Sequence, residues 1–454
     1  MELLTLPVHH DSRVAEAGNP LADRLRARYA LAMSEITAVP DGIGPGRATP
    51  GPHDPDQISQ GTAADWRAIA ELMAMTFHGS PEDEAGAEAV FEPDRSLLIR
   101  DGDEIVAHAA AYTRDLTVPG AVLPAAHVTM VGVAPTHRRQ GMLTRLMHRQ
   151  LAEVPEPIAV LWASEGRIYP RFGYGMASQR VSLEIETREV RLPAPATAPG
   201  RVRTVPADAA RPRLRDVYEA VRADRPGLSS RDDRWWGRRL EDPPGHREGA
   251  TALRVSLHDS GDGPDGYALW RVRSDWGQGG PQGEVRVREL IAASPEAYLG
   301  LWRFLLGIDL TRSVTLRLTG PDEPLLWLVD EPRRLRVTQG DGLYLRIVDL
   351  PAALSARRYA APVDLVIEVS DPLLARNAGR WHLVGGPDGA SCLRTDRPAD
   401  LACGIGELGA AYLGGTKLAV LADAGRVREL TPGVLAAAST AFGWHRAPVS
   451  LEIF

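Results

Sequence analysis

The chain is 454 residues long, which exceeds one typical hydrophobic core, so we expect two to four domains. Its net charge of −7 and isoelectric point of about 6.0 argue against a nucleic-acid or anionic-membrane partner. The two cysteines, Cys392 and Cys403, have no histidine clustered near them, which excludes a disulfide framework and leaves a metal site unsupported. There is no membrane-spanning apolar run and no N-terminal signal pattern, so we expect a cytoplasmic protein without a membrane partner.

The first 57 residues have the composition of an N-terminal extension. Residues 20–36 can form a short helix, and the segment after them mixes Pro, Gly and Asp, which cannot bury enough apolar surface to fold alone. We therefore predict that residues 1–57 are largely disordered, or that they lie upstream of the true start codon.

A helix is predicted from about Thr62 onward, because apolar residues recur there at helical spacing. Its core stripe consists of Trp66, Ile69, Ala70, Met73 and Phe77. An acidic cluster that includes Glu82 follows at residues 82–88. This cluster is either a solvated helix N-terminus stabilised by the helix dipole or a rim that attracts a cationic amine, and both interpretations stay open.

Strands are then predicted at residues 96–100, 105–112 and 116–118. The next stretch, residues 127–151, predicts a strand ending at Val133, a basic turn through Arg138, Arg139 and Gly141, and an amphipathic helix. The first N–H groups of a helix have no partner, and its dipole is positive at that end. The glycine permits close approach of a polyphosphate and the arginines add charge, so this turn predicts an anion site. A P-loop is excluded because no Lys-Ser/Thr pair follows the glycine.

The pattern V-x-V-x-P-x-x-R-R-x-G-x-x-x-x-L resembles the acyl-CoA-binding segment of the GNAT N-acetyltransferases. The usual GNAT pattern has a small residue two positions after its first glycine, and Leu143 stands there in this chain. The resemblance implies that acetyl-CoA is the co-substrate. Taken alone, the stretch is also compatible with a surface helix with a basic first turn in another α/β protein.

A tyrosine that follows the predicted strand at residues 158–162 is the candidate catalytic acid. Acetyl transfer from a thioester to an amine needs a base for the ammonium and an acid for the departing thiolate. Tyrosine suits the acid role, since its unperturbed pKa is about 10. Residues 169–174 fit the Y-x-x-x-G-[FY] pattern of GNAT proteins, which matches Tyr169 to the catalytic tyrosine and assigns Tyr174 to packing. The alternative for Tyr169 is an ordinary half-buried tyrosine.

The segment after residue 206 repeats the same order of elements. A helix is predicted at residues 208–222, strands at 252–257, 267–273 and 283–293, and a helix from Ser294. In place of the basic turn, the repeat has Ser294, Pro295, Glu296 and Ala297. Pro removes an N–H, Glu repels phosphate and no Gly permits close approach. We therefore predict that the second copy does not bind CoA.

Several separate motifs together resemble the enhanced-intracellular-survival (Eis) family within the GNAT superfamily, over roughly residues 58–454. They read LTVPGAVLP, VAPTHRRQGML, ASEGRIYPRFGYG, DGYALWRV, DGLYLRI, AAYLGG and the final LEIF. The resemblance implies an α+β fold, in which tandem GNAT-like domains with mixed, mostly antiparallel sheets precede an α/β domain like sterol carrier protein. The expected divisions are an extension (1–57), a catalytic GNAT domain (58–195), a degenerate GNAT-like domain (196–345) and a sterol-carrier-like domain (346–454). The resemblance to the family also implies a homohexamer.

Carried over residue by residue, the resemblance implies an acetyl-CoA site and a pair of catalytic groups. The cofactor would contact the backbone of Met130, Val131 and Val133 as well as Arg138, Arg139, Gly141, Met142, Leu143 and Ser164. Tyr169 would be the general acid, and the carboxylate of the terminal residue, Phe454, would be the general base. Because an unperturbed terminal carboxyl has a pKa near 3.5, such a base must be desolvated or act through water.

The resemblance also implies where substrate binds, and the chain departs from the family there. Phe77 matches a substrate-contacting position, but His78 and Gly79 replace the Asp that follows it in aminoglycoside-acetylating members. Ile453 occupies the place of a penultimate acid, and Glu452 precedes it. The acids available for a cationic substrate are therefore Glu452 and the cluster beginning at Glu82.

The leading hypothesis is an acetyl-CoA-dependent N-acetyltransferase acting on primary amines of a cationic small molecule, with aminoglycosides as candidates. A near rival is an enzyme of the same type acting on protein lysines or polyamines. A rival of another class is a binding protein that uses the sterol-carrier-like domain and has a vestigial GNAT site. The intact basic turn argues against this last reading, because a dead site should have decayed as the second copy did.

Overall fold

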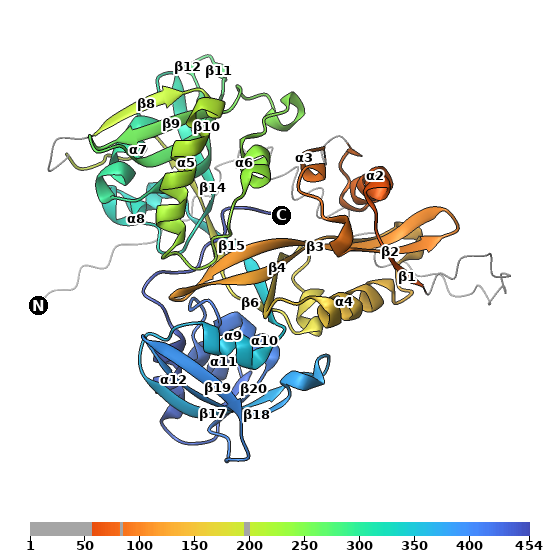
Figure 1. Cartoon of the computed structure of the whole chain (residues 1–454). Helices are drawn as coiled ribbons and strands as arrows, with labels where there is room; N and C mark the ends of the chain where they lie inside the picture. The colour runs from red at the N-terminus through yellow and green to blue at the C-terminus, as the bar shows by residue number, and fades with distance from the viewer. Residues whose placement is uncertain (1–56, 82–84, 195–199) are drawn as a thin grey trace, which may run out of the picture. The chain divides into compact units, whose positions relative to one another are not determined.

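A computed structural model describes residues 57–81, 85–194 and 200–454 (Figure 1). The predicted N-terminal extension, apart from Gln57, and Glu82 with its two neighbours lie outside the described residues. The described residues form three larger sheets and a small hairpin.

The first sheet has seven strands in the order β1-β2-β3-β4-β5-β16-β6. They are β1 (Ile58–Gln60), β2 (Ser96–Asp101), β3 (Glu104–Val118), β4 (Ala121–Val133), β5 (Ile158–Trp162), β16 (Leu343–Ile347) and β6 (Gly175–Met176). The accompanying helices are α2 (Trp66–Phe77), α3 (Ala85–Glu88) and α4 (Met142–Glu153). Neighbouring strands are antiparallel except for β4 and β5, which are parallel because α4 crosses between them.

The second sheet repeats this plan in the order β15-β7-β14-β13-β10-β9-β8. Its strands are β15 (Thr338–Asp341), β7 (Gln179–Glu186), β14 (Thr311–Thr319), β13 (Gly283–Ala292), β10 (Pro264–Arg273), β9 (Arg254–Asp259) and β8 (Arg201–Val205), and its helices are α5 (Ala207–Arg222), α6 (Asp233–Leu240), α7 (Pro295–Leu306) and α8 (Leu325–Leu328). A hairpin of β11 (Trp276–Gly277) and β12 (Gly280–Pro281) extends from it. The parallel pair β13 and β14 flanks α7 as β4 and β5 flank α4, so the predicted internal repeat is present.

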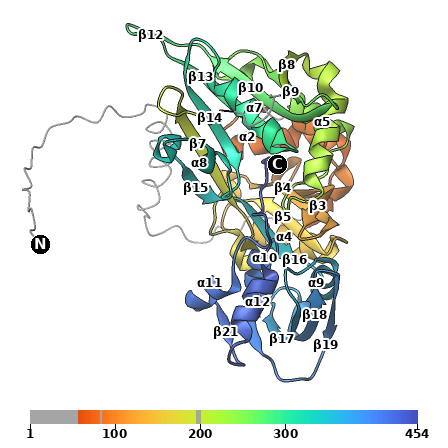
Figure 2. The same ribbon diagram turned by 90° about the vertical axis from the view of Figure 1, so that its left-hand side faces the viewer.

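The two sheets exchange strands. β7 precedes most of the second unit in the chain and pairs there with β14 and β15. β16 follows the second unit and returns to the first sheet, where it pairs with β5 and β6. Figure 2 shows β16 beside β5, although about 180 residues separate them in the sequence. The exchange connects the two units at two places, so the expected divisions at residues 195 and 345 do not coincide with the sheets.

The third sheet has the order β19-β18-β17-β20-β21 and a helical layer. The elements are β19 (Gly389–Arg394), β18 (Gly379–Gly386), β17 (Val363–Ser370), β20 (Leu401–Gly404), β21 (Val427–Glu429), α9 (Leu350–Ala356), α10 (Ile405–Ala411), α11 (Leu418–Asp423) and α12 (Val434–Phe442). The apolar residues at 401–413 predict a short helix, and this prediction is wrong for the first four of them, which form β20 and pair with β17. A short apolar run permits a helix or a buried strand, and here tertiary pairing decides.

The interior of the third unit contains a buried cation that is held by backbone carbonyls and aromatic rings. Arg357 is fully buried and donates to the backbone carbonyls of Tyr412 (2.6 Å) and Phe442 (2.9 Å). Its guanidinium also lies 4.7 Å from the ring centroid of Tyr359. These contacts replace water around the charge, and three aromatic side chains close the core around it.

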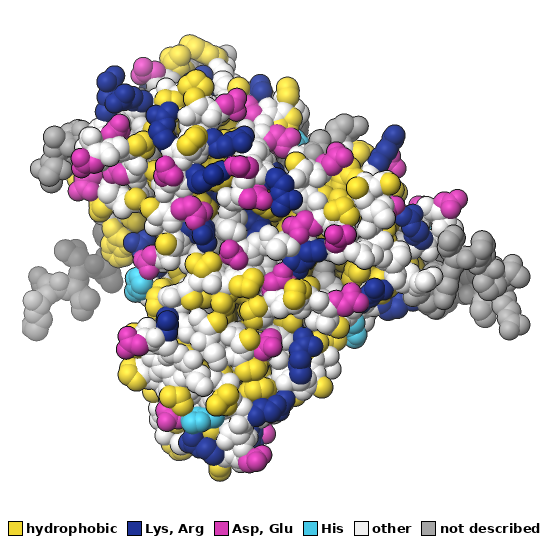
Figure 3. All heavy atoms as spheres, viewed as in Figure 1, with side chains coloured by type: hydrophobic (Ala, Val, Ile, Leu, Met, Phe, Trp, Pro, Cys, Tyr) yellow, Lys and Arg dark blue, Asp and Glu magenta, His cyan; other side chains and the backbone are white. Residues whose placement is uncertain are grey.

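Surface charge agrees with the modest net charge of the chain. On the face drawn in Figure 3, basic and acidic side chains are interspersed, and no broad area of one sign is seen among the described residues there. No helix within the described ranges is long and apolar enough to cross a membrane.

Candidate active site

Two cavities meet beside the first sheet. The first cavity, of about 480 Å³, lies along the basic turn and the start of α4. The second cavity, of about 430 Å³, reaches Phe454. Four residues line both of them, namely Phe77, Val131, Ser164 and Tyr169. A molecule bound in one cavity can therefore react with a molecule bound in the other at this shared wall.

A break in the first sheet creates the space. β4 pairs with β5 only over residues 125–127, and beyond that point the two strands separate. The ladder between β3 and β4 also shifts register, and Met130 has a left-handed backbone with φ of 48°. Such a β-bulge leaves part of the ladder unpaired and turns the local backbone away from its neighbour. This geometry puts the backbone of residues 130–133 at the cavities.

A buried histidine holds the bulge in place. His108 Nδ1 lies 2.7 Å from the carbonyl oxygen of Met130, and Nε2 lies 2.8 Å from Ser96 Oγ. Burial lowers the pKa of His108 to about 4, so the ring is neutral near pH 7. Because a carbonyl only accepts, Nδ1 carries the proton and Nε2 accepts from the serine hydroxyl. The ring therefore donates from Nδ1 to the bulge and accepts at Nε2 from Ser96.

The basic turn has the geometry of an anion site. Gly141 precedes α4 with φ of 80°, and no side chain caps the helix. The backbone N–H groups of the first turn are therefore open to the cavity, which is lined there by Met142, Leu143 and Thr144. Arg138 and Arg139 are exposed beside it. This arrangement fits the phosphate groups of acetyl-CoA.

The conformation of Gly141 gives a test of this turn. Substituting Gly141 by Ala meets no neighbouring atom within 4 Å, but it forces a side chain into the left-handed region at a cost of about 1 kcal/mol. We expect the KM for acetyl-CoA to rise up to about tenfold, because the backbone relaxes away from the phosphate-binding geometry. Steady-state kinetics with varied acetyl-CoA measure this.

Gly425 is a matched control, since its φ is 73° and its surroundings are also open. The Gly425→Ala variant lies in the third unit, so it should lose similar stability in thermal melting with an unchanged KM. An unchanged KM in Gly141→Ala, or an equal rise in both variants, would contradict the role of the turn.

The corresponding turn of the second unit is closed. Ser294 caps α7 by accepting from the N–H of Ala297 at 3.0 Å, and its hydroxyl donates to Asp265 at 2.6 Å. Pro295 and Glu296 occupy the first turn. The basic turn before α4 has free N–H groups and positive charge, whereas this turn has a capping serine and two acids, Asp265 and Glu296. The difference supports the prediction that the second copy binds no CoA.

Tyr169 stands where the two cavities meet. It opens a short 3-10 turn after β5, and only 6% of its surface is exposed. Burial, with a contribution from Glu165, raises its pKa to about 12, so the hydroxyl stays protonated through the physiological range. Tyr174 packs against it edge to face at 5.9 Å, is fully buried and lines neither of the two cavities.

The last residues of the chain reach the second cavity. Phe454 lines it, and its ring lies 4.8 Å from the ring of His127. The same side chain packs beside a cluster formed by Val90, Tyr112 and Trp235, so the C-terminus lies between α6 and the first sheet (Figure 1). Glu452, in contrast, does not line this cavity, and its carboxylate is bound by arginines.

The structure therefore brings together most of the residues expected at the site. Tyr169 and Phe454, which are the expected catalytic pair, line one or both cavities, as do Phe77 and every expected cofactor-binding residue. Phe77 is not the core residue that its helical spacing predicted, because 50% of its surface is exposed at the end of α2, where it faces the cavities. Glu82 lies outside the described residues.

Residues that sequence reasoning missed come mainly from outside the first unit. Arg180 on β7, Arg238 on α6 and Asp341 on β15 line the cavity that ends at Phe454. No local pattern marks these positions, because their place at the site depends on the strand exchange and on the packing of α6. Together they give this cavity charges of both signs.

Comparison with known proteins agrees with this architecture. Residues 57–177 and residues 227–347 each match a model described as an acetyltransferase (GNAT) domain, and residues 350–450 match a sterol carrier protein domain. An uncharacterized N-acetyltransferase of Streptomyces avermitilis is 44% identical over 397 residues, covering 85% of this chain and 96% of the relative. The N-acetyltransferase Eis of Mycobacterium tuberculosis is 36% identical over 404 residues, covering 84% and 95% respectively.

Solved structures show the same fold. Eis1 from Mycobacterium abscessus aligns with a TM-score of 0.76 at 33% identity, covering 88% of this chain and all of that one. An N-acetyltransferase from Anabaena variabilis aligns with a TM-score of 0.77 at 22% identity and the same coverage. The fold and the matched domains define an acyltransferase of the GNAT superfamily, with tandem GNAT domains before a sterol-carrier-like domain. Within that superfamily, the chain belongs to the Eis family of N-acetyltransferases.

Proposed function

We propose that this protein transfers the acetyl group of acetyl-CoA to a primary amine, with Tyr169 as general acid and the carboxylate of Phe454 as general base. The observation that carries the proposal is the shared wall of the two cavities. Tyr169 lines both, the basic turn lies on one side, and Phe454 lies on the other.

GNAT enzymes in general use acetyl-CoA, and the first cavity suits it. The open N–H groups of α4 and the two exposed arginines, Arg138 and Arg139, would hold its phosphates. The backbone of Met130, Val131 and Val133 and the Ser164 side chain would line the pantetheine arm and the acyl end. Acetyl-CoA supplies the thioester whose acetyl group is transferred.

The proposed proton movements balance at the shared wall. The neutral amine attacks the thioester carbonyl, a C–N bond forms and the C–S bond breaks. The proton lost by the amine passes to the carboxylate of Phe454, directly or through water, and Tyr169 gives its proton to the departing thiolate. The high pKa of Tyr169 keeps that proton in place until thiolate charge develops.

The acceptor we propose is a cationic small molecule, with aminoglycosides as the first compounds to test. The terminal carboxylate and Asp341 would attract an ammonium group in the second cavity. Arg180 and Arg238 also line this cavity, so the acceptor must place its other cationic groups away from them. Proteins with exposed lysines and polyamines are the competing acceptors of the same reaction class.

A panel assay tests the proposal. The protein is mixed with acetyl-CoA and with kanamycin, spermidine, a lysine peptide or a simple monoamine, and released CoA is measured with a thiol-reactive dye. Acetylation of kanamycin supports the small-molecule proposal, and turnover of the lysine peptide alone would assign the protein acceptor. Absence of CoA release with every amine would overturn the proposed function.

The family resemblance also leads us to propose a homohexamer. Size-exclusion chromatography with light scattering measures the mass directly, and a single 49.1 kDa species would contradict it.

A further inference from the structure

The segment that carries Phe454 has no regular secondary structure. Residues 447–454 form neither helix nor strand, so no ladder of backbone hydrogen bonds fixes their path. Three bonds tie the segment to the rest of the protein upstream: the Ala447 N–H donates to Asp322 at 3.0 Å, the Val449 N–H donates to the carbonyl of Pro226 at 2.9 Å, and the Trp162 indole donates to Ser450 Oγ at 3.2 Å. Ser450 Oγ in turn donates to the carbonyl oxygen of Glu452 at 3.0 Å, within the segment. The position of the last three residues therefore depends on the side-chain contacts that these residues make themselves.

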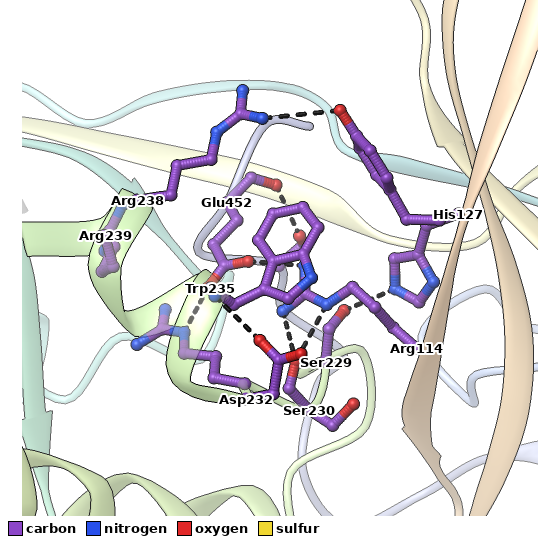
Figure 4. A network of polar contacts seen from close by, with 12 residues as sticks. Arg114, His127, Ser229, Ser230, Asp232, Trp235, Arg238, Arg239 and Glu452 are labelled. Atoms are coloured by element: carbon purple, nitrogen blue, oxygen red, sulfur yellow. Dashed lines mark hydrogen bonds and ion pairs between the residues drawn. The ribbon is translucent and has the colours of Figure 1, made fainter. Parts of the chain in front are cut away.

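Glu452 is held between two buried arginines from different units. Figure 4 shows its contact with one of them, Arg114. One carboxylate oxygen accepts from Arg114 Nη1 at 2.7 Å, and the other accepts from Arg231 Nε. Arg114 lies on β3, and its side chain is 1% exposed, while Arg231 precedes α6 and its side chain is fully buried. We name Glu452 with Arg114 and Arg231 the tail clamp.

Both arginines are themselves fixed, so the clamp is rigid. Arg231 makes a bidentate ion pair with Glu289 at 3.0 and 2.7 Å. Arg114 donates twice to the carbonyl of Ser230, at 2.8 and 2.6 Å. A guanidinium that is bonded on several sides loses little further freedom on gripping a carboxylate.

Aromatic side chains close the clamp from the sides. The Arg114 guanidinium lies 3.9 Å from the ring centroid of Trp235, and that of Arg231 lies 3.9 Å from the ring centroid of Tyr218. Burial alone would raise the pKa of Glu452, but the two arginines outweigh burial and hold it well below its ordinary range. Glu452 is therefore a carboxylate whenever the protein is folded near neutral pH.

The two residues after Glu452 point in different directions, one to solvent and one into the second cavity. Ile453 is 61% exposed, whereas Phe454 packs at 4.8 Å from His127 in the second cavity. His127 Nδ1 faces the carbonyl of Ala125 at 2.9 Å, and Nε2 faces Ser229 Oγ at 2.7 Å, so both ring nitrogens are already bonded. The ring therefore offers Phe454 a packing surface and no hydrogen bond.

We propose that Glu452 is a positioning residue: held by Arg114 of the first GNAT unit and Arg231 of the second, it places the carboxylate of Phe454 beside the acceptor amine. The proposal rests on the proposed role of that carboxylate as general base. It also gives the second unit, whose cofactor turn is closed, a function in catalysis. That unit supplies Arg231 and the Glu289 that orients it.

The test is the Glu452→Gln variant of the full-length protein, which keeps the size of the side chain and removes its charge. We expect kcat to fall about 10- to 100-fold, because a displacement of about 1 Å at a reacting group has that effect. The KM for acetyl-CoA should stay within about twofold of wild type, since the first cavity is unchanged. Because a partly unfolded sample also loses kcat at an unchanged KM, calorimetry must show that CoA binds the variant with the stoichiometry of wild type.

Glu156→Gln is the matched control. Glu156 is also a buried carboxylate with a bidentate arginine partner, Arg95, at 2.5 and 2.9 Å, and it does not touch the tail. Its kcat should equal that of wild type. If thermal melting shows that Glu452→Gln is unfolded, Arg114→Lys replaces it, because lysine keeps the charge and loses the forked geometry.

Two results would overturn the proposal: an unchanged kcat in a folded Glu452→Gln or Arg114→Lys variant, or an equal loss of kcat in Glu156→Gln. Failure of the clamp and failure of the base are distinguishable. If extending the chain beyond Phe454 leaves turnover intact, the terminal carboxylate is not the base. If that extension abolishes turnover and Glu452→Gln does not lower it, only the clamp proposal fails.

Discussion

Appending four residues, Gly-Ser-Gly-Ser, after Phe454 is expected to abolish detectable turnover while acetyl-CoA affinity stays nearly unchanged. The extension converts the carboxylate of Phe454 into an amide and moves the new carboxylate out of the cavity that Phe454 lines. Losing a positioned general base costs about 10²- to 10⁴-fold in rate. The first cavity, where acetyl-CoA is proposed to bind, does not include Phe454, so its affinity should not respond.

The measurements are kcat with the best amine of the panel and the Kd of CoA by calorimetry. The same four residues attached to the N-terminus serve as the control for a general effect of a tag. Equal turnover of the two tagged proteins and wild type would remove the terminal carboxylate from the mechanism.

Replacing Tyr169 by Phe is expected to lower kcat about 100-fold or more, because no other group is proposed to donate a proton to the departing thiolate. The substitution keeps the ring and its edge-to-face contact with Tyr174. The KM for acetyl-CoA should therefore change by less than about twofold. Since burial holds the pKa of Tyr169 at about 12, wild-type kcat should not fall between pH 7 and pH 10 through ionisation of this group.

Tyr174→Phe is the matched control, five residues away on the same segment. The Tyr174 hydroxyl is buried and has no hydrogen-bond partner among the described atoms. Its removal should leave kcat unchanged and cost no stability, since no bond is lost. A wild-type kcat in Tyr169→Phe would exclude Tyr169 as the acid, and an equal loss in both variants would point to packing of the segment.

The basic turn shows what a local sequence can predict. The strand before it, Gly141 and the amphipathic helix after it are contiguous, and each was read from spacing and residue type alone. The structure confirms the helix, which begins at Met142, and adds that the glycine before it has a left-handed backbone. The second copy gives another example of local prediction. Ser294 and Pro295 predict a closed helix N-terminus, and the capping hydrogen bond is present in the structure.

Local patterns gave two wrong predictions, a core position for Phe77 and a helix at residues 401–404. Helical spacing places Phe77 on the apolar face of α2, but at the end of that helix its side chain lines the two cavities and is half exposed. Residues 401–404 are apolar and short enough for either state, and pairing with β17 selects the strand. In both cases neighbours that are distant in sequence decide the outcome.

The sequence by itself determined the repeated order of elements, the basic turn and the place of Tyr169 after β5, because each can be predicted from residues that are close together in the chain. Only the tertiary structure decided how the tail is held and which residues of the second unit reach the site. Glu452 lies 338 residues from Arg114 and 221 residues from Arg231, and no periodicity or motif connects positions so far apart. Folding brings them together because buried charges are stable only when opposite charges and hydrogen bonds surround them.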